Sequence, residues 1–339
     1  MFDIHTPLPA SKKEEEEVSP FIHIQGVSKT FKEKEILNDV TFSLKKGEIL
    51  SLVGASGSGK STFLRILAGL ESATKGKVLI DGNDISSTKP QNRPIGMVFQ
   101  QPLLFPHMNV LENVMYGLEM RGEKKRENKR KAKDYIQRVG LGEVMHHYPS
   151  ELSGGQRQRV SLIRSLILKP KLLLLDEPFS SLDLQLRREL RQWVLTVFKE
   201  EGTTVLFVTH DRDEAYEVGD RVAVLHEGRF LQAGTPEEIY YRPGSSFVAS
   251  FMSDGLILSP GQFIHASHLS ISSSGEALPH PKWKGKIQQK LFVAGTNIHE
   301  IWVEELKQTL HLPLDRESSH GTVWLYAKEE NIQTFQNGE

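Results

Sequence analysis

The hydrophobic pattern from Phe21 onwards alternates short apolar segments with longer helical stretches. This alternation is typical of an α/β core built on a largely parallel sheet. Strands covered on both faces are apolar at every position rather than at every second one. We therefore expect buried strands at residues 48–53, 171–175, 203–208 and 221–225.

Two stretches depart from this pattern. Residues 102–149 are helical in character and rich in Glu, Lys and Arg, which predicts a helical subdomain, about 102–165, inserted into the α/β domain. After about Gly255 the composition shifts to Ser, His and Pro, and segments of period two follow at 285–292, 296–303 and 321–327. We expect an α/β domain over residues 21–255 and a small all-β domain over residues 256–339.

The first twenty residues contain Lys12 and Lys13, then glutamate at each of positions 14–17, and no apolar segment of the kind found in secretory signals. We expect a disordered acidic tail. A spanning helix needs roughly 20 consecutive apolar residues, and runs such as 172–175 are far shorter. The chain is therefore not expected to cross a membrane.

Charge and cysteine content exclude some functions. The 42 Lys and Arg residues nearly balance the 43 Asp and Glu residues, so no overall field points to nucleic acid, which is not an expected partner. The sequence contains no cysteine, which excludes disulfides, thiolate zinc sites and thiol nucleophiles.

The segment after the first buried strand matches the phosphate-binding pattern GxxxxGK[ST] and precedes a predicted amphipathic helix at 62–70. Its glycines let backbone amides turn towards phosphate oxygens, the helix start adds its positive dipole end, and Lys60 can reach the β- and γ-phosphates. Ser61 is placed to ligate Mg²⁺. The alternative is a plain glycine turn. The predicted ATP-binding residues here are Gly54, Ala55, Ser56, Gly57, Ser58, Gly59, Lys60, Ser61 and Thr62.

A second element is the apolar strand that ends in Asp176 and Glu177. Asp176 can hold Mg²⁺, as the Walker B aspartate of P-loop NTPases does. Glu177 is placed to polarise an attacking water and is the candidate general base. An isolated pair of acids at a strand end is more often solvated surface, but its occurrence beside a phosphate loop favours catalysis.

Between these elements lies the sequence LSGGQRQR, before a predicted helix at 160–168. Its serine and glycines place a hydroxyl and bare amides at a helix start, which favours anion binding over a flexible loop once the other motifs are considered. This segment resembles the signature sequence of the ABC ATPase family, and the resemblance covers roughly residues 21–251. The signature residues are Ser153, Gly154, Gly155 and Gln156.

The resemblance gives roles to further residues. Gln100 is similar to the Q-loop glutamine, which touches the Mg²⁺ and water region. Residues 180–183, which end in Asp183, are similar to the D-loop, which crosses the dimer interface in the family. His210 resembles the switch histidine that contacts the γ-phosphate, although a histidine at a strand end is more often structural. Phe31 stands where the family stacks an aromatic ring on adenine, with a core residue as the alternative.

Two positions depart from the family pattern. Ala55 stands where proline is frequent, a change that leaves every phosphate-contacting group in place. The sequence FMSD at 251–254 replaces the FIG-type sequence that often follows this domain, which makes the boundary near Gly255 approximate.

The resemblance also implies an architecture and partners. In the family two ATP molecules join a head-to-tail dimer, so that Ser153 and Gly155 of one protomer complete the site of the other. The segment QQPLLFPHM at 100–108, followed by LENV, resembles the permease-facing segment of importers for maltose, polyamines, iron(III) and sulfate. We expect a homodimer on the cytoplasmic face of the cell membrane, bound to integral permease subunits and served indirectly by an external solute-binding protein.

The C-terminal part resembles the small OB-type regulatory domain of these importers. It spans about 84 residues after Gly255, which is shorter than in the sugar transporters and favours an inorganic ion such as iron(III) over sugar or polyamine. The main alternative function is a soluble ABC ATPase acting on ribosomes or DNA. A P-loop kinase and a purely regulatory binding protein are the others.

One charged run stands apart from these motifs, with eight cations between positions 121 and 133. It could face anionic lipid near the permease, but nearby glutamates favour a solvated helix face. The eight cations are Arg121, Lys124, Lys125, Arg126, Lys129, Arg130, Lys131 and Lys133.

Overall fold

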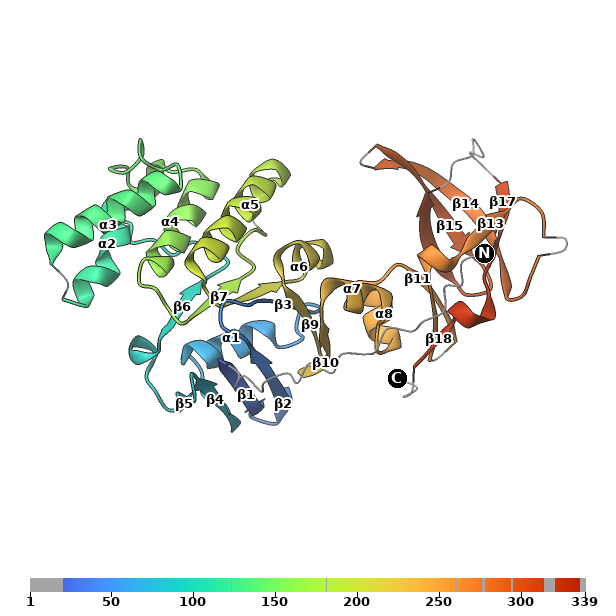
Figure 1. The fold of residues 1–339 in the computed structure, drawn as a ribbon, viewed down its shortest axis with the longest axis horizontal. Helices are drawn as coiled ribbons and strands as arrows, with labels where there is room; N and C mark the ends of the chain where they lie inside the picture. The colour runs from blue at the N-terminus through green and yellow to red at the C-terminus, as the bar shows by residue number, and fades with distance from the viewer. Residues whose placement is uncertain are drawn as a thin grey trace, which may run out of the picture.

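The computed structural model describes residues 21–335 apart from positions 123, 181, 260, 276–277, 294 and 314–320. The acidic tail predicted for residues 1–20 lies outside the described residues. An α/β part with helices at one end is followed by a β-rich part at the other end (Figure 1).

A six-stranded sheet forms the centre of the α/β part. Five of its strands run parallel to one another, and the sixth, the edge strand β10, pairs antiparallel with its neighbour β9. The four predicted buried strands are confirmed as β3, β7, β8 and β9, because all of their residues are buried except one at the end of β7 and one at each end of β9. The order is β10 (Arg229–Gly234), β9 (Arg221–His226), β3 (Ile49–Val53), β8 (Val205–Thr209), β7 (Leu172–Asp176) and β6 (Ile95–Val98).

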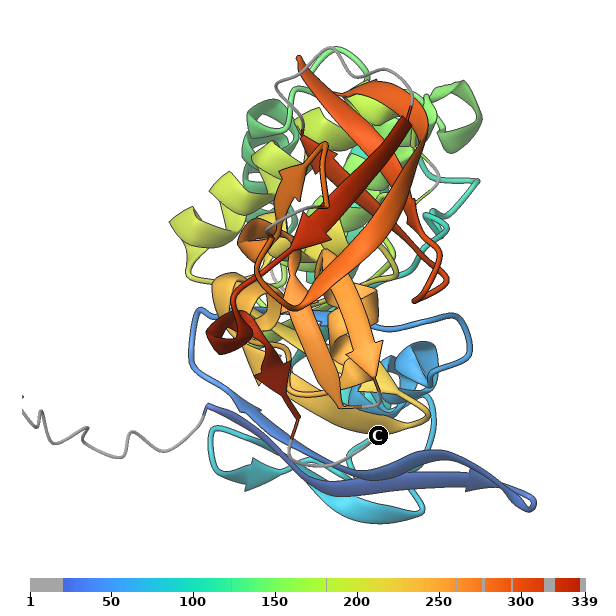
Figure 2. The same ribbon diagram turned by 90° about the vertical axis from the view of Figure 1, so that its right-hand side faces the viewer.

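A second, antiparallel sheet lies beside the first and forms the long β1–β2 ribbon at the bottom of Figure 2. Its strands are β2 (Lys34–Leu44), β1 (Ile22–Phe31), β4 (Lys75–Ile80) and β5 (Asn83–Asp84).

Different elements cover the two faces of the six-stranded sheet. Leu172 and Leu174 of β7 pack in one cluster with α1 (Lys60–Ala68) and the antiparallel sheet. Leu173 and Leu175 pack in another cluster with α4 (Gly154–Leu166) and α5 (Leu184–Glu201). Because successive strand residues point to opposite faces, α1 and α4 lie on opposite sides of the sheet.

The predicted helical insertion contains α2 (Val110–Met120) and α3 (Lys125–Arg138), which pack with α4 around a separate apolar cluster. The helix predicted at 160–168 from the apolar pattern begins earlier, at Gly154, so the helix start indicated by the serine and glycines is confirmed. Ser153 caps it by accepting from the amide of Gln156, while the side chain of Gln156 accepts from the amide of Ser153. This capping box extends the helix over two glycines that ordinarily disfavour helix.

Short helices connect the α/β part to the C-terminal strands. α7 (Pro236–Tyr241) and α8 (Ser246–Met252) follow β10 and lead to β11 (Gly255–Ser259). α6 (Arg212–Val218) lies between β8 and β9. Arg212 pairs with Asp254 at 2.9 Å, and the hydroxyl of Tyr240 donates to the other oxygen of that carboxylate at 3.0 Å. Ala249 of α8 packs with Phe263 of β12, so the junction is both polar and apolar.

The C-terminal strands form two antiparallel sheets, as the period-two segments predicted (Figure 2). The segments at 285–292, 296–303 and 321–327 are observed as β14, β15 and β17. The sheets contain β11 (Gly255–Ser259), β12 (Gln262–His265) and β18 (Gln333–Thr334), and then β13 (Ser270–Ser272), β17 (Gly321–Tyr326), β14 (Lys282–Val293), β15 (Thr296–Val303) and β16 (Gln308–Pro313).

Within the described part of the chain, no helix has the length and apolar character required to cross a membrane.

One buried arginine fixes the end of α1. The Arg93 guanidinium donates to the carbonyl oxygens of Ile66 and Leu67 in the last turn of α1, and also to those of Ser86 and Thr88. Helix ends leave carbonyls without intrahelical partners, and Arg93 satisfies them while joining α1 to the loop before β6. Water has little access to these hydrogen bonds, because Arg93 is only 8% exposed.

We expect Arg93→Ala to lower the free energy of unfolding by about 2–4 kcal/mol, since it leaves several buried carbonyls without donors. Urea unfolding followed by circular dichroism measures this change. Arg130→Ala on the exposed side of α3 is the control and should change stability by less than about 0.5 kcal/mol. Equal stabilities for the two variants would contradict the role given to Arg93.

Candidate functional site

The predicted phosphate loop connects β3 to α1 and requires glycine at two positions. A Cβ on Gly54 would lie 2.2 Å from the carbonyl oxygen of Leu225, and one on Gly59 would lie 2.9 Å from that of Ile36. Gly59 also has φ of 106° and is the N-cap of α1, with no side chain to satisfy the first amides of the helix. The loop therefore presents bare amides and the positive end of the α1 dipole, as anion sites do.

Lys60 is buried at the base of this loop. Its Nζ donates to the carbonyl oxygens of Gly54 at 2.6 Å and Ala55 at 3.1 Å. Burial lowers the pKa of Lys60, and the nearby carboxylates of Glu177 and Asp176 oppose that shift. The ammonium is held by weakly basic carbonyls and two acids, and a ligand with more negative charge would bind it more strongly.

Asp176 ends β7 beside the start of α1. Burial raises the pKa of Asp176, and the adjacent charge of Glu177 raises it further. Lys60, Arg65 and a hydrogen bond from Ser61 act in the opposite direction. The net result is a carboxylate whose negative charge is incompletely compensated by its surroundings.

Glu177 adopts an unusual backbone conformation that aims its side chain. Its φ is 44°, and its amide donates to the carbonyl of Val208 in the neighbouring strand. Its Oε2 lies 3.0 Å from Nδ1 of His210 and accepts from Nε2 of Gln100 at 3.5 Å. A left-handed conformation at a residue other than glycine is uncommon and concentrates at functional sites.

Ser180 is a residue of this site that the sequence analysis did not single out. Its hydroxyl accepts from Nε2 of Gln100 at 3.1 Å and donates to the carbonyl of Glu177 at 3.0 Å. It fixes Gln100 beside the carboxylate. The sequence signals were its place at the start of the D-loop-like residues 180–183 and its position three residues after Glu177, which allows a local bond from side chain to backbone.

The loop after β8 holds His210. The buried Thr209 hydroxyl donates to Glu214 at 2.7 Å and accepts from the amide of Asp211. Asp211 in turn caps α6 by accepting from the amides of Asp213 and Glu214. These bonds fix the backbone on both sides of His210, while its ring remains exposed.

The signature residues start α4 on the other face of the sheet. Ser153 is the N-cap, and Gly154, Gly155 and Gln156 form the first turn. A Cβ on Gly155 would lie 2.4 Å from Cδ2 of Leu186, so the starts of α4 and α5 are in close contact. In the described part of the chain, no recorded hydrogen bond or ion pair joins these signature residues to the phosphate loop.

Two further predicted residues occupy defined positions. Asp183 is the N-cap of α5 and accepts from the amide of Leu186 at 3.0 Å, whereas the D-loop residue before Leu182 lies outside the described residues. Phe31 ends β1 and is 43% exposed, so the alternative that it belongs to the core is wrong. Nζ of Lys29 lies 4.5 Å from the centre of its ring.

The residues expected to hold Mg²⁺ provide hard oxygen donors. Ser61 is close enough to Asp176 for its hydroxyl to lower the pKa of that carboxyl group, which places the two oxygen donors near each other. Among the described residues there is no cluster of three or more His, Cys, Asp or Glu side chains able to hold a metal by themselves. The donor set fits a cation that keeps waters and binds partly through phosphate, as Mg²⁺ does.

Comparison with known proteins places these motifs in a family. The ABC transporter family model matches residues 37–180. The chain is 39% identical over 326 residues to a sulfate/thiosulfate import ATP-binding protein CysA of Bacillus cereus, covering 94% of this chain and 90% of that one. It is 44% identical over 237 residues to an Fe(3+) ions import ATP-binding protein FbpC of Pasteurella multocida, covering 70% of this chain and 68% of the other.

Two solved structures resemble the α/β part. A dimeric post-hydrolysis state of the ATP-binding cassette MJ0796 bound to ADP and Pi aligns with a TM-score of 0.57 and 32% identity, covering 63% of this chain and 98% of that one. CbiO1 of Clostridium perfringens, part of the ABC transporter complex cbiONQ, aligns with a TM-score of 0.61 and 28% identity, covering 65% of this chain and 90% of the other.

The raised pKa of Asp176 predicts how the stability of the nucleotide-free protein depends on pH. In the unfolded chain this carboxyl ionises near its ordinary pKa, whereas in the folded chain ionisation is less favourable. Asp176 therefore lowers stability increasingly as pH rises from about 4 through its raised pKa. We expect Asp176→Asn to stabilise the folded chain, with an advantage that grows over this interval and then levels off.

Urea unfolding at several pH values measures this advantage. Asp213→Asn, at an exposed position in the first turn of α6, is the control and should show no comparable gain with rising pH. A stability difference for Asp176→Asn that stays constant with pH would contradict the incomplete compensation of its charge.

Proposed function

We propose a mechanism and a biological role for this chain, which belongs to the ABC transporter family as an import ATP-binding protein and ATP hydrolase. The convergence of Lys60, Asp176, Glu177, Gln100 and His210 at the ends of neighbouring strands carries the proposal. In it, hydrolysis of ATP in a head-to-tail homodimer drives uptake of an inorganic ion through a separate permease.

Phosphate binding begins with Lys60. Its ammonium exchanges the carbonyls of Gly54 and Ala55 for the β- and γ-phosphate oxygens, while free amides of the loop and of the start of α1 surround those oxygens. Charge-assisted bonds to phosphate are stronger than bonds to neutral carbonyls, so nucleotide binding replaces the weak bonds of the buried ammonium with stronger ones. Phe31 stacks on the adenine ring.

Glu177 acts as general base on the attacking water. Its carboxylate accepts from Gln100 and His210, and its backbone is fixed by Val208 and Ser180. These partners hold the carboxylate where it can orient a water in line with the γ-phosphate. Orientation rather than covalent chemistry provides most of the catalysis of phosphoryl transfer. His210 contacts the γ-phosphate and can exchange its bond to Glu177 for one to that group.

Ser61, Asp176 and Gln100 would hold Mg²⁺ together with phosphate oxygens. The ion supplies charge neutralisation on the transferred group. Asp176, whose charge is incompletely compensated in the protein alone, is suited to a cationic partner.

The signature acts in trans. Since α4 and α1 lie on opposite faces of the sheet, Ser153, Gly154, Gly155 and Gln156 complete the site of a second protomer rather than their own. Asp183 and Leu182 lie at that dimer interface, beside the start of α4. Closing the pair of protomers excludes water from both sites.

The membrane partner is an integral permease, with an external solute-binding protein acting indirectly. Residues 100–108 are the permease-facing segment and begin with Gln100, so movement of Gln100 is transmitted to the permease. Phe105 within this segment packs on Tyr116 of α2, with ring centres 4.6 Å apart, which joins it to the helical insertion. The chain is therefore peripheral, on the cytoplasmic face of the cell membrane.

The solute is an inorganic ion. The relatives named for sulfate/thiosulfate and those named for Fe(3+) share this class. The relative aligned over 94% of the chain is named for sulfate/thiosulfate, whereas the one named for Fe(3+) aligns over 70%. On this basis sulfate or thiosulfate ranks ahead of iron(III), and sugar and polyamine rank behind both. Residues 21–255 form the ATPase domain and residues 256–339 an OB-like regulatory domain.

Replacement of the base separates binding from hydrolysis. We expect Glu177→Gln to retain ATP binding, lower the hydrolysis rate at least about a hundredfold and accumulate an ATP-bound dimer, because the amide cannot accept the proton of water. Phosphate release and size-exclusion chromatography with ATP measure these effects. Lys60→Ala is the contrasting variant, which should lose ATP affinity itself. Near-normal turnover of Glu177→Gln would remove Glu177 from the mechanism.

Purification from native membranes tests the partners. We expect the tagged chain to bring an integral permease out of detergent extract, identified by mass spectrometry. The solute bound by the associated external protein then distinguishes sulfate or thiosulfate from iron(III). Recovery of ribosomes or DNA-associated proteins without a permease would leave the ATPase intact and replace the importer with a soluble ABC ATPase.

A further inference from the structure

α3 carries a row of cations along one flank of its buried face. Its buried residues Asn128, Ala132 and Ile136 mark the face that packs inside the helical insertion. Residues spaced i, i+3, i+4 and i+7 share one face of a helix. Exposed basic residues occupy this spacing beside the buried face, and we name them the basic stripe: Arg126, Lys129, Arg130 and Lys133.

The two acids of α3 lie towards the opposite flank. Glu127 and Asp134 each precede a cation by four residues, Lys131 and Arg138 respectively, which is the favourable helical spacing for opposite charges. Of the basic stripe, only Arg130 is within three or four residues of these acids. Among the described residues, no recorded ion pair involves any of its four side chains. The balance expected from nearby glutamates therefore applies to one flank of α3 only.

The position of α3 favours a membrane as the partner. α3 packs on α2 at the end of the molecule far from the β-rich part (Figure 1). The same α2 holds Phe105 of the proposed permease-facing segment through Tyr116. The stripe is thus fixed to the unit that meets the permease at the bilayer surface. Cytoplasmic leaflets carry anionic lipids that attract basic segments within roughly one Debye length, whereas the balanced total charge of the chain gives nucleic acid no general attraction.

We propose that the basic stripe docks on anionic phospholipid headgroups beside the permease. This inference rests on the membrane placement in the proposed function and adds a second contact to it. The phosphate groups of the lipids accept from Arg126, Lys129, Arg130 and Lys133, and the contact orients the helical insertion against the bilayer.

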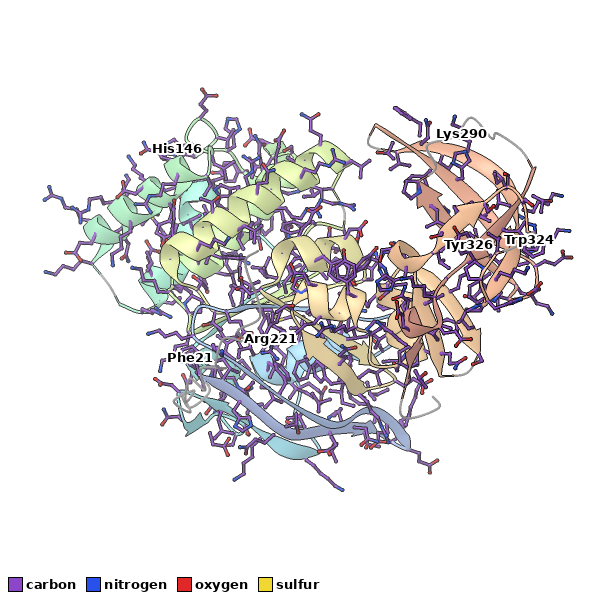
Figure 3. The ribbon with its side chains drawn as sticks, turned by 45° about the vertical axis from the view of Figure 1, so that its right-hand side comes forward. Phe21, His146, Arg221, Lys290, Trp324 and Tyr326 are labelled. Atoms are coloured by element: carbon purple, nitrogen blue, oxygen red, sulfur yellow. The ribbon has the colours of Figure 1, made fainter. Side chains whose placement is uncertain are left out.

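The test uses the purified full chain without permease. Its sedimentation with phosphatidylcholine vesicles is compared with and without phosphatidylglycerol, at low and high salt. A variant with glutamine at all four stripe positions removes the charge and retains helix propensity. A matched control replaces four exposed lysines remote from α3 with glutamine: Lys284, Lys286 and Lys290 of β14 and Lys75 of β4. Lys290 is labelled on the β-rich part in Figure 3.

We expect the wild type to bind anionic but not neutral vesicles, with loss at high salt. Each cation near an anionic surface strengthens association about fivefold, so the stripe variant should lose about a hundredfold or more. The control should lose less than about tenfold, and circular dichroism and ATP hydrolysis should match the wild type in both variants.

Equal vesicle binding by the stripe variant and the wild type, or equal losses in the two variants, would overturn the proposal. Tight binding of a single-stranded oligonucleotide through the stripe, without vesicle binding, would assign this surface to nucleic acid instead. Recovery of the permease from membranes is measured separately, so a failed lipid test leaves the importer assignment standing.

Discussion

Hydrogen bonding among β3, β8 and β7 in parallel register is the constraint on which this site depends. Val53 pairs with Thr209, and Val208 pairs with Asp176, so the three strands end at the same level of the sheet. The phosphate loop, His210 and Glu177 each follow directly from one of these strand ends. A shift of one residue in either pairing would direct the side chains of that strand to the opposite face and separate these groups.

The same edge contains charges that the protein does not fully compensate. Burial disfavours the charged form of both Lys60 and Asp176, and the backbone of Glu177 is held at a positive φ. These unfavourable features are tolerated because the surrounding sheet and its apolar clusters are extensive. Stability is given up locally to preorganise groups for a charged substrate, which is the usual balance between stability and activity.

The central strands and the phosphate loop could be predicted from the sequence, because continuous apolar runs and fixed glycine spacing are local signals. Two sequence signals disagreed about the start of α4. The apolar pattern predicted a helix only from residue 160, whereas the serine and glycines indicated a helix start near Ser153, and the capping bonds of Ser153 and Gln156 form there. Ser180 was missed because its partner Gln100 lies 80 positions away in the sequence. The exposure of Phe31 agrees with the position that the family resemblance gave it, whereas hydrophobicity alone would have placed this ring in the core.

The placement of α1 and α4 on opposite faces of one sheet has a genetic consequence under the head-to-tail arrangement. Each composite site draws its phosphate loop from one chain and its signature from the other. Two defective alleles, one damaged at Lys60 and the other at Ser153, can therefore assemble a mixed dimer in which one site is built entirely from undamaged halves. The second site of that dimer combines both lesions, so complementation between the alleles restores at most one working site for each pair of chains.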